Sequence, residues 1–133
     1  MIMQLSKFTD YSFRALVYLA QNQDRLCTVE ELAKNLHTSE HHMKKVVHKL
    51  ATGGYITSLK GRAGGLHLGM EPKNINLGEI LKFTEDNLNI FSCYLETDTC
   101  PLRSCGCKLK QVSHIALGHF IHEFEKYTLE DVL

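Results

Sequence analysis

The sequence predicts a mainly α-helical protein: a winged helix-turn-helix domain with a small β-hairpin wing, followed by a long C-terminal dimerisation helix. Three observations predict this class. Apolar residues recur at helical spacing in consecutive segments before residue 53. A basic, glycine-rich turn at residues 60–65 lies between two short runs that are typical of strands. Residues 108–126 carry a broad apolar face at helical spacing.

The first two helices are expected at residues 9–21 and from Thr28 onward. Residues 10–20 are apolar around most of a helix circumference, which indicates a buried helix, and Thr9 can cap it. Thr28 and Glu31 have the spacing of a capping box, in which each side chain accepts a hydrogen bond from the other's backbone N–H. The apolar spacing that follows predicts a short amphipathic helix.

The third helix and the hairpin complete the predicted domain. Ser39 can cap a helix that runs to about Thr52 and is followed by two glycines. Its apolar residues recur at i, i+3, i+4 and i+7, which leaves the opposite face polar and basic. The β-branched or alternating patterns of residues 55–59 and 66–68 predict two strands. Asn76 can cap a further helix.

Charge is balanced overall but not along the chain. The sequence has 15 basic and 15 acidic residues. Residues 38–70 hold five basic residues and one acidic residue, a net +4, whereas residues 76–99 hold one basic and five acidic residues, a net −4. This asymmetry indicates that the middle segment meets phosphate groups while the following segment faces elsewhere.

The third helix and the turn of the hairpin are therefore the predicted contacts with double-stranded DNA. Residues near the start of such a helix reach base edges in the major groove, while lysines meet phosphates. An arginine in a glycine-rich wing can enter the minor groove. The alternative interpretation is a solvated polar face followed by an ordinary hairpin turn. The candidate DNA-binding residues are Ser39, His41, His42, Lys44, Lys45, Lys49, Lys60, Arg62 and Gly64.

Four of the five cysteines fall within fifteen residues, at Cys93, Cys100, Cys105 and Cys107. The chain shows no secretory signal and no apolar run long enough to cross a membrane, so we expect a cytoplasmic protein with no membrane partner. In that compartment, crowded thiols indicate metal or redox chemistry before disulfides. Zinc sites usually have paired cysteines two to four residues apart, unlike these spacings. An iron–sulfur cluster held by three cysteines and an outside ligand is favoured, with zinc and buried thiols as alternatives.

Three segments are expected along the chain. Residues 1–86 form the winged-helix DNA-binding domain, residues 87–107 the cysteine-rich cluster-binding loop, and residues 108–133 the dimerisation helix and C-terminal tail. The last helix is too long and too apolar for one chain of this size to cover, so we expect a homodimer interface rather than packing on its own domain. A thiol-redox enzyme that uses Cys105 and Cys107 would leave the basic helix and hairpin unexplained, so no enzymatic activity is expected.

Five stretches of the chain resemble the NsrR/IscR-type family of iron–sulfur winged-helix transcriptional regulators, most closely its nitric-oxide-sensing NsrR branch. They are residues 5–16 (Leu-Ser-Lys-Phe-Thr-Asp-Tyr-Ser-Phe-Arg-Ala-Leu), 39–43 (Ser-Glu-His-His-Met), 60–65 (Lys-Gly-Arg-Ala-Gly-Gly), 107–111 (Cys-Lys-Leu-Lys-Gln) and 127–131 (Tyr-Thr-Leu-Glu-Asp). The match runs in register over nearly the whole chain, so the motifs are specific as a set.

The resemblance implies a homodimeric repressor that binds a palindromic operator and responds to nitric oxide. It implies one cluster per subunit, with [4Fe–4S] favoured over [2Fe–2S]. The implied ligands are Cys93, Cys100 and Cys107 of one chain and the partner subunit's Asp10, with Cys105 as the alternative ligand. From the residues alone, an acid at position 10 is explained by its favourable place near a helix N-terminus.

The cysteine spacing departs from the pattern that the NsrR branch usually shows. That branch places five residues between its second and third cysteines, whereas here Cys105 follows after four and Cys107 after six. The Lys-Leu-Lys-Gln run after Cys107 favours Cys107 as the ligand. The IscR branch has a histidine three residues after its third cysteine, where this chain has Lys110. An IscR-like sensor of redox or iron–sulfur status therefore stays an alternative, as does a zinc- or thiol-based winged-helix repressor.

Overall fold

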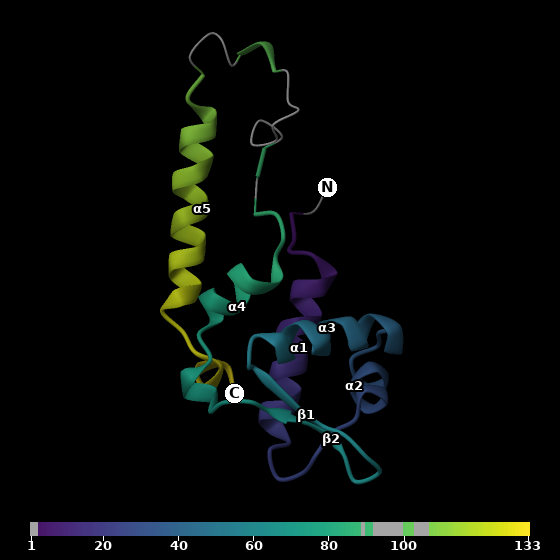
Figure 1. Cartoon of the computed structure of the whole chain (residues 1–133). Helices are drawn as coiled ribbons and strands as arrows, with labels where there is room; N and C mark the ends of the chain where they lie inside the picture. The colour runs from purple at the N-terminus through teal and green to yellow at the C-terminus, as the bar shows by residue number, and fades with distance from the viewer. Residues whose placement is uncertain (1–2, 89, 92–99, 103–106) are drawn as a thin grey trace.

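Figure 1 shows the computed structural model of the protein, which describes residues 3–88, 90–91, 100–102 and 107–133. The described part is mainly helical and contains one two-stranded antiparallel hairpin, as the sequence predicts. Its elements, in chain order, are α1 (Lys7–Gln21), α2 (Val29–Asn35), α3 (Glu40–Thr52), β1 (Ile56–Leu59), β2 (Gly65–Leu68), η1 (Pro72–Asn74), α4 (Leu77–Thr84), α5 (Leu109–Glu125) and η4 (Leu129–Val132).

The α1 helix begins two residues before the predicted position, and Ser6 caps it instead of Thr9. The Ser6 hydroxyl accepts the backbone N–H of Thr9 at 3.2 Å. Thr9 is fully buried, and its hydroxyl accepts a hydrogen bond at 3.1 Å from Thr84 of α4. The predicted cap is therefore an interior helical residue that joins α1 to α4.

The capping box predicted at α2 is confirmed for the Thr28 hydroxyl, which accepts the Glu31 backbone N–H at 3.0 Å. The Glu31 carboxylate instead accepts hydrogen bonds from Arg25 at 2.9 Å and from the Tyr18 hydroxyl at 2.6 Å. These two hydrogen bonds, with that of Arg25 the larger cause, lower the pKa of Glu31 to about 2. Glu31 thus fastens the start of α2 to α1 and to the preceding loop.

The α3 helix and the hairpin follow the sequence prediction closely. Ser39 caps α3 by accepting the His42 backbone N–H at 3.1 Å. The predicted apolar stripe is buried, as expected for a helix that packs on α1. Ile56 pairs with Leu68 and Leu59 with Gly65, so residues 60–64 form the loop between the strands, which we call the wing. The buried residues of the α3 stripe are Met43, Val46, Val47 and Leu50.

One hydrophobic core holds the winged-helix part together. The α1 helix runs through it (Figure 1), and Leu16 and Leu19 are almost completely buried against α3 and β2. Cys27 is also fully buried, and its backbone pairs with that of Leu66 as an isolated β-bridge, so it behaves as a small apolar residue.

The C-terminal elements fold back on this core. Asn76 caps α4 by accepting the Glu79 backbone N–H at 3.1 Å, as predicted, and its amide donates to the Glu125 carbonyl of α5 at 2.8 Å. A Cβ on Gly78 would lie 2.9 Å from the Glu125 Cα, so α4 and α5 can approach this closely only because position 78 is glycine. Leu129 of η4 is fully buried in the core. The C-terminal end of α5 is therefore fixed to the winged-helix part.

The α5 helix itself is largely uncovered. Ser113 is its one buried residue in the part of the chain that the structure describes, while Val112 is 60% exposed and Ile115 is 53% exposed. Within the described ranges, no helix has the length and apolar character that crossing a membrane requires.

Candidate functional site

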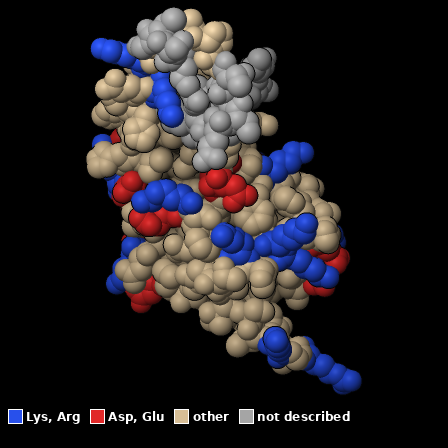
Figure 2. All heavy atoms as spheres, turned by 45° about the horizontal axis from the view of Figure 1, so that its top comes forward, with Lys and Arg blue, Asp and Glu red and all other residues tan. Residues whose placement is uncertain are grey.

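The polar face of α3 presents basic side chains to solvent. Lys44, Lys45 and His41 are exposed on this face, close to the helix start that Ser39 caps. Figure 2 shows Lys and Arg side chains in a band across the viewed face and at the tip of a projection. A capped helix start with exposed basic neighbours has the arrangement that reads a major groove while holding the flanking phosphates.

The wing supplies the second group of basic residues. Lys60 and Arg62 are exposed in the loop between β1 and β2, which directly follows α3. Gly64 has a structural reason to be glycine, because a Cβ there would lie 2.1 Å from the carbonyl oxygen of Leu59. The tight turn that projects Lys60 and Arg62 therefore depends on Gly64.

Two candidate DNA-binding residues contact neighbouring helices instead of projecting into solvent. The His42 ring meets the rings of Phe8 and Tyr11 edge-on, at centroid distances of 6.2 Å and 5.5 Å. The Lys49 ammonium lies 4.4 Å from the ring centroid of Phe83 in α4. Sequence periodicity places both residues beside the polar face, but it cannot show these contacts between helices.

The predicted metal ligands are only partly within the described residues. Cys93 and Cys105 lie outside them. Cys100 is half-buried and Cys107 is exposed just before α5, where its backbone N–H donates to the Leu102 carbonyl at 3.4 Å. In the described ranges, no group of three or more His, Cys, Asp or Glu side chains is placed to hold a metal ion. The ligand set therefore stays a prediction.

Asp10 lies in the first turn of α1, half-exposed, and accepts a hydrogen bond from the Arg14 guanidinium at 2.8 Å. It opens onto a surface cavity of about 370 Å³, which we call the Asp10 cavity. The cavity lies between the start of α1 and the end of α5, and sequence patterns give no signal for it. Its lining residues are Gln4, Leu5, Lys7, Asp10, Tyr11, Phe13 and Phe124.

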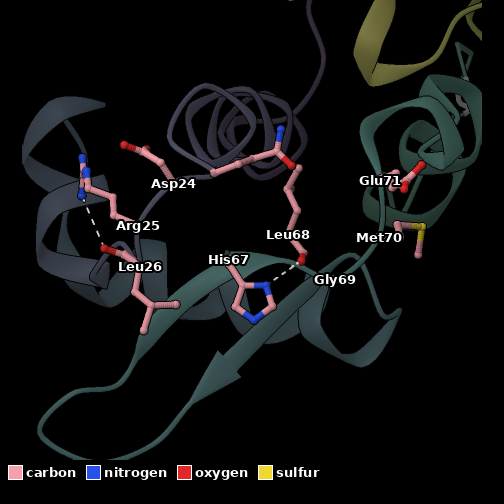
Figure 3. A pocket seen from close by; sticks show the side chains of 9 residues that line it. Asp24, Arg25, Leu26, His67, Leu68, Gly69, Met70 and Glu71 are labelled. Atoms are coloured by element: carbon pink, nitrogen blue, oxygen red, sulfur yellow. Dashed lines mark hydrogen bonds between the residues drawn. The ribbon is translucent and has the colours of Figure 1, made fainter.

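A second pocket, of about 530 Å³, lies where the α1–α2 loop meets β2 (Figure 3). His67 is bonded through Nδ1 to the Leu68 carbonyl at 2.7 Å, and Arg25 binds Glu31. Glu71 pairs with Lys73 at 3.1 Å. Since these polar groups bind within the chain, we assign the pocket no ligand.

The donor chemistry of the predicted cluster ligands fits a soft iron centre. Thiolates are the usual ligands of iron–sulfur clusters, and the two described thiols, Cys100 and Cys107, are half-buried and exposed. The Asp10 carboxylate is half-exposed beside the Asp10 cavity, where a second chain can approach it. Ligation of iron by Asp10 would require its carboxylate to release the Arg14 guanidinium that it binds at 2.8 Å.

Comparison with known proteins gives consistent results. A family model described as "Rrf2: Iron-dependent Transcriptional regulator" matches residues 5–133. The HTH-type transcriptional regulator NsrR of Shouchella clausii is 44% identical over 98% of this chain and 89% of its own length. CymR, the global cysteine regulator of B. subtilis, shares the fold with a TM-score of 0.73 and 24% identity, over 98% of this chain and 96% of that one. The IscR of T. potens has a TM-score of 0.73 and 22% identity, over 98% and 85%.

Proposed function

Because this chain belongs to the Rrf2 family of transcriptional regulators, we propose that it is a homodimeric repressor whose operator binding is controlled by a nitric-oxide-sensitive iron–sulfur cluster. The family makes the protein a DNA-binding regulator and not an enzyme. Two facts together carry the finer proposal. The chain is similar to NsrR proteins over nearly its full length. It also has four cysteines between its winged helix and α5.

The DNA contacts are assigned to α3 and the wing. The exposed start of α3 offers Ser39 and His41 for base edges and Lys44 and Lys45 for phosphates. The wing offers Lys60, Arg62 and the close backbone approach of Gly64. A palindromic operator matches a two-fold symmetric dimer, since each half-site takes one α3 helix at a fixed separation.

Dimerisation is assigned to α5. Its apolar side chains lie uncovered along one chain, as the exposure of Val112 and Ile115 shows. Apolar surface of this extent on a soluble regulator marks a site of protein association. Two copies of α5 packed on each other would cover it and set the distance between the two winged helices.

The cluster ligands are Cys93, Cys100 and Cys107, with the partner subunit's Asp10 as the fourth ligand or Cys105 in its place. When bound, an iron–sulfur cluster would supply iron that reacts with nitric oxide, and it would link the two chains, held by the thiols of one chain and by Asp10 in the first turn of α1 of the other. The residues of this chain hold that link on one side through the thiols and on the other through the first turn of α1. Without that link the separation of the two α3 helices would be less constrained, and operator affinity would fall.

Anaerobic purification tests this function. We expect a coloured dimer that contains iron and sulfide but no zinc, and that loses operator affinity on exposure to nitric oxide. Cys93→Ala and Cys100→Ala are expected to remove both iron and the nitric oxide response, whereas Cys105→Ala keeps both if Cys107 is the third ligand. An iron-free protein with full operator affinity contradicts the proposal, and a zinc-containing one selects the zinc- or thiol-based alternative.

The same preparation separates the DNA contacts from the cluster. Lys45→Ala or Arg62→Ala removes one basic side chain from each subunit, so it is expected to weaken operator binding and to lower the slope of log affinity against log salt by about two per dimer. Iron content is expected to stay unchanged, because both residues lie at least 30 positions before the predicted ligand cysteines in the sequence. An IscR-like sensor would change its operator affinity in response to oxidants or iron supply.

A further inference from the structure

We propose that the Tyr11–His42 ring contact transmits what occupies the Asp10 cavity to the DNA-reading helix α3. The inference rests on the proposed function, in which Asp10 helps to hold a cluster bound by the partner subunit. It adds the path inside this chain by which that event alters DNA affinity.

Tyr11 has two different neighbours. On one side it lines the Asp10 cavity together with Asp10 itself. The Arg14 guanidinium that binds Asp10 also lies over the Tyr11 ring, 5.7 Å from its centroid. On the other side the Tyr11 ring meets the His42 ring edge-on, at 5.5 Å and an interplanar angle of 74°. Tyr11 therefore borders both the Asp10 cavity and His42 of α3.

His42 ties Tyr11 to the part of α3 that is assigned to base reading. It belongs to the first turn, and its backbone N–H is bonded to the capping Ser39 hydroxyl at 3.1 Å. His41, the adjacent residue, is exposed. Since packed side chains pass displacements on to their neighbours, we expect movement of the Tyr11 ring to move His42 and with it the start of α3.

The His42 imidazole also carries an unexplained polar atom. Its Nε2 is buried and has no hydrogen-bond partner among the residues that the structure describes. An unsatisfied buried nitrogen lowers stability, so hydrogen bonding does not explain the placement of this ring, and its contacts with the Phe8 and Tyr11 rings do. The burial of Nε2 also directs the ring toward α1 and away from DNA, which makes His42 a positioning residue.

Phe8 provides a matched control for Tyr11. Both residues are on α1 and both meet the His42 ring edge-on, Phe8 at 6.2 Å and 76°. Only Tyr11 of the two lines the Asp10 cavity. Replacing either by leucine removes one aromatic contact with His42, but only Tyr11→Leu interrupts the path from the cavity.

The test compares operator Kd for cluster-loaded and cluster-free dimers, with iron and sulfide measured on each sample. For the unaltered protein we expect the two Kd values to differ at least tenfold. His42→Ala and Tyr11→Leu are expected to bring the ratio of the two Kd values within about twofold of one. His42→Ala is expected to keep its iron. Phe8→Leu is expected to keep the ratio of the unaltered protein. His42→Phe, which preserves the ring, is expected to restore the ratio.

A purely structural role for His42 lowers both affinities equally and leaves the ratio unchanged, which overturns the inference. If Tyr11→Leu loses iron, His42→Ala decides, because His42 does not line the Asp10 cavity. An unaltered protein whose two Kd values are equal contradicts the proposed function instead, so the two failures are distinct.

A second measurement avoids the cluster entirely. In cluster-free protein labelled with 3-fluorotyrosine, the resonance of Tyr11 is assigned among the five tyrosines with a Tyr11→Phe sample. Coupling between two sites is reciprocal, so operator binding is expected to shift the Tyr11 resonance in the unaltered protein and not in His42→Ala. An unshifted Tyr11 resonance in the unaltered protein contradicts the path.

Discussion

The winged-helix part and α5 differ in how they satisfy their apolar residues. In the first, α1, α3 and α4 bury their stripes against one another, and Leu16, Leu50 and Ile80 are completely buried. In the second, Val112 and Ile115 of one helix stay more than half exposed. The chain therefore encodes one complete core and, under the proposed dimer, one half of an interface, so the stability of the second part would depend on protein concentration.

Truncating the core is expected to have the largest effect. Leu16→Ala removes a completely buried side chain between α1 and its neighbours and is expected to lower the free energy of unfolding by about 2–5 kcal/mol. Urea denaturation below the dimerisation concentration measures this. Val112→Ala is the control on α5 and is expected to change the same quantity by less than about 0.5 kcal/mol. Equal effects would abolish the contrast between the two parts.

Charging the exposed face of α5 is expected to act on association instead. Ile115→Asp places a carboxylate in each half of a symmetric interface, and dimerisation is expected to weaken at least a hundredfold, about 2.8 kcal/mol. Sedimentation equilibrium measures the dimer Kd, while urea denaturation of the monomer is expected to stay unchanged. If the dimer Kd is unaltered, the dimer interface does not include this face of α5.

Gly64→Ala tests whether the wing belongs to the self-sufficient part. The added Cβ meets the Leu59 carbonyl oxygen at 2.1 Å and the Gly61 carbonyl oxygen at 2.9 Å, so the turn must distort, at a cost of about 1–2 kcal/mol. Operator affinity is expected to fall because Lys60 and Arg62 are redirected. Ala63→Gly, one position earlier, is the control, and a wing that tolerates both changes equally refutes the steric argument.

Lowering the pH is expected to have the smallest effect on stability, through the Glu31 contacts that join α2 to α1. The pKa of Glu31 is lowered to about 2 in the folded chain, first by Arg25 and then by Tyr18. Its contribution is therefore present above the ordinary glutamate pKa and is lost as pH falls through about 2. Because Arg25 is substantially exposed, we expect only about 0.5–1 kcal/mol. Glu31→Gln should remove this part of the loss between pH 5 and pH 2, as thermal denaturation would show.

Local sequence patterns predicted the elements of the winged helix because their signals are local. Ser39, Asn76 and Thr28 cap the helices that their positions indicate. Thr9 was predicted as a cap wrongly, because Ser6 takes that role and Thr9 bonds to Thr84, which is 75 residues away. A contact at that sequence separation leaves no trace in periodicity.

The candidate site divides in the same way. The exposed basic residues of α3 and the wing could be selected from charge and helical spacing alone. His42 and Lys49 occupy similar positions in that pattern, yet each meets an aromatic ring of another helix. The Asp10 cavity requires α5 to return beside α1, so Phe124 could not be placed there from the sequence. Cys93 and Cys105 lie outside the described residues and stay predictions.

The fastening of α5 at one end gives the molecule a mechanical property. The C-terminal end of α5 is anchored by Asn76, Gly78 and the buried Leu129. From there its 17 residues extend about 25 Å to Leu109 at the N-terminal end. A stiff rod of that length, tilted by roughly 5° at its anchor, displaces its far tip by about 2 Å. A small rotation at the anchored C-terminal end of α5 would therefore produce a larger displacement at its N-terminal end, beside Cys107.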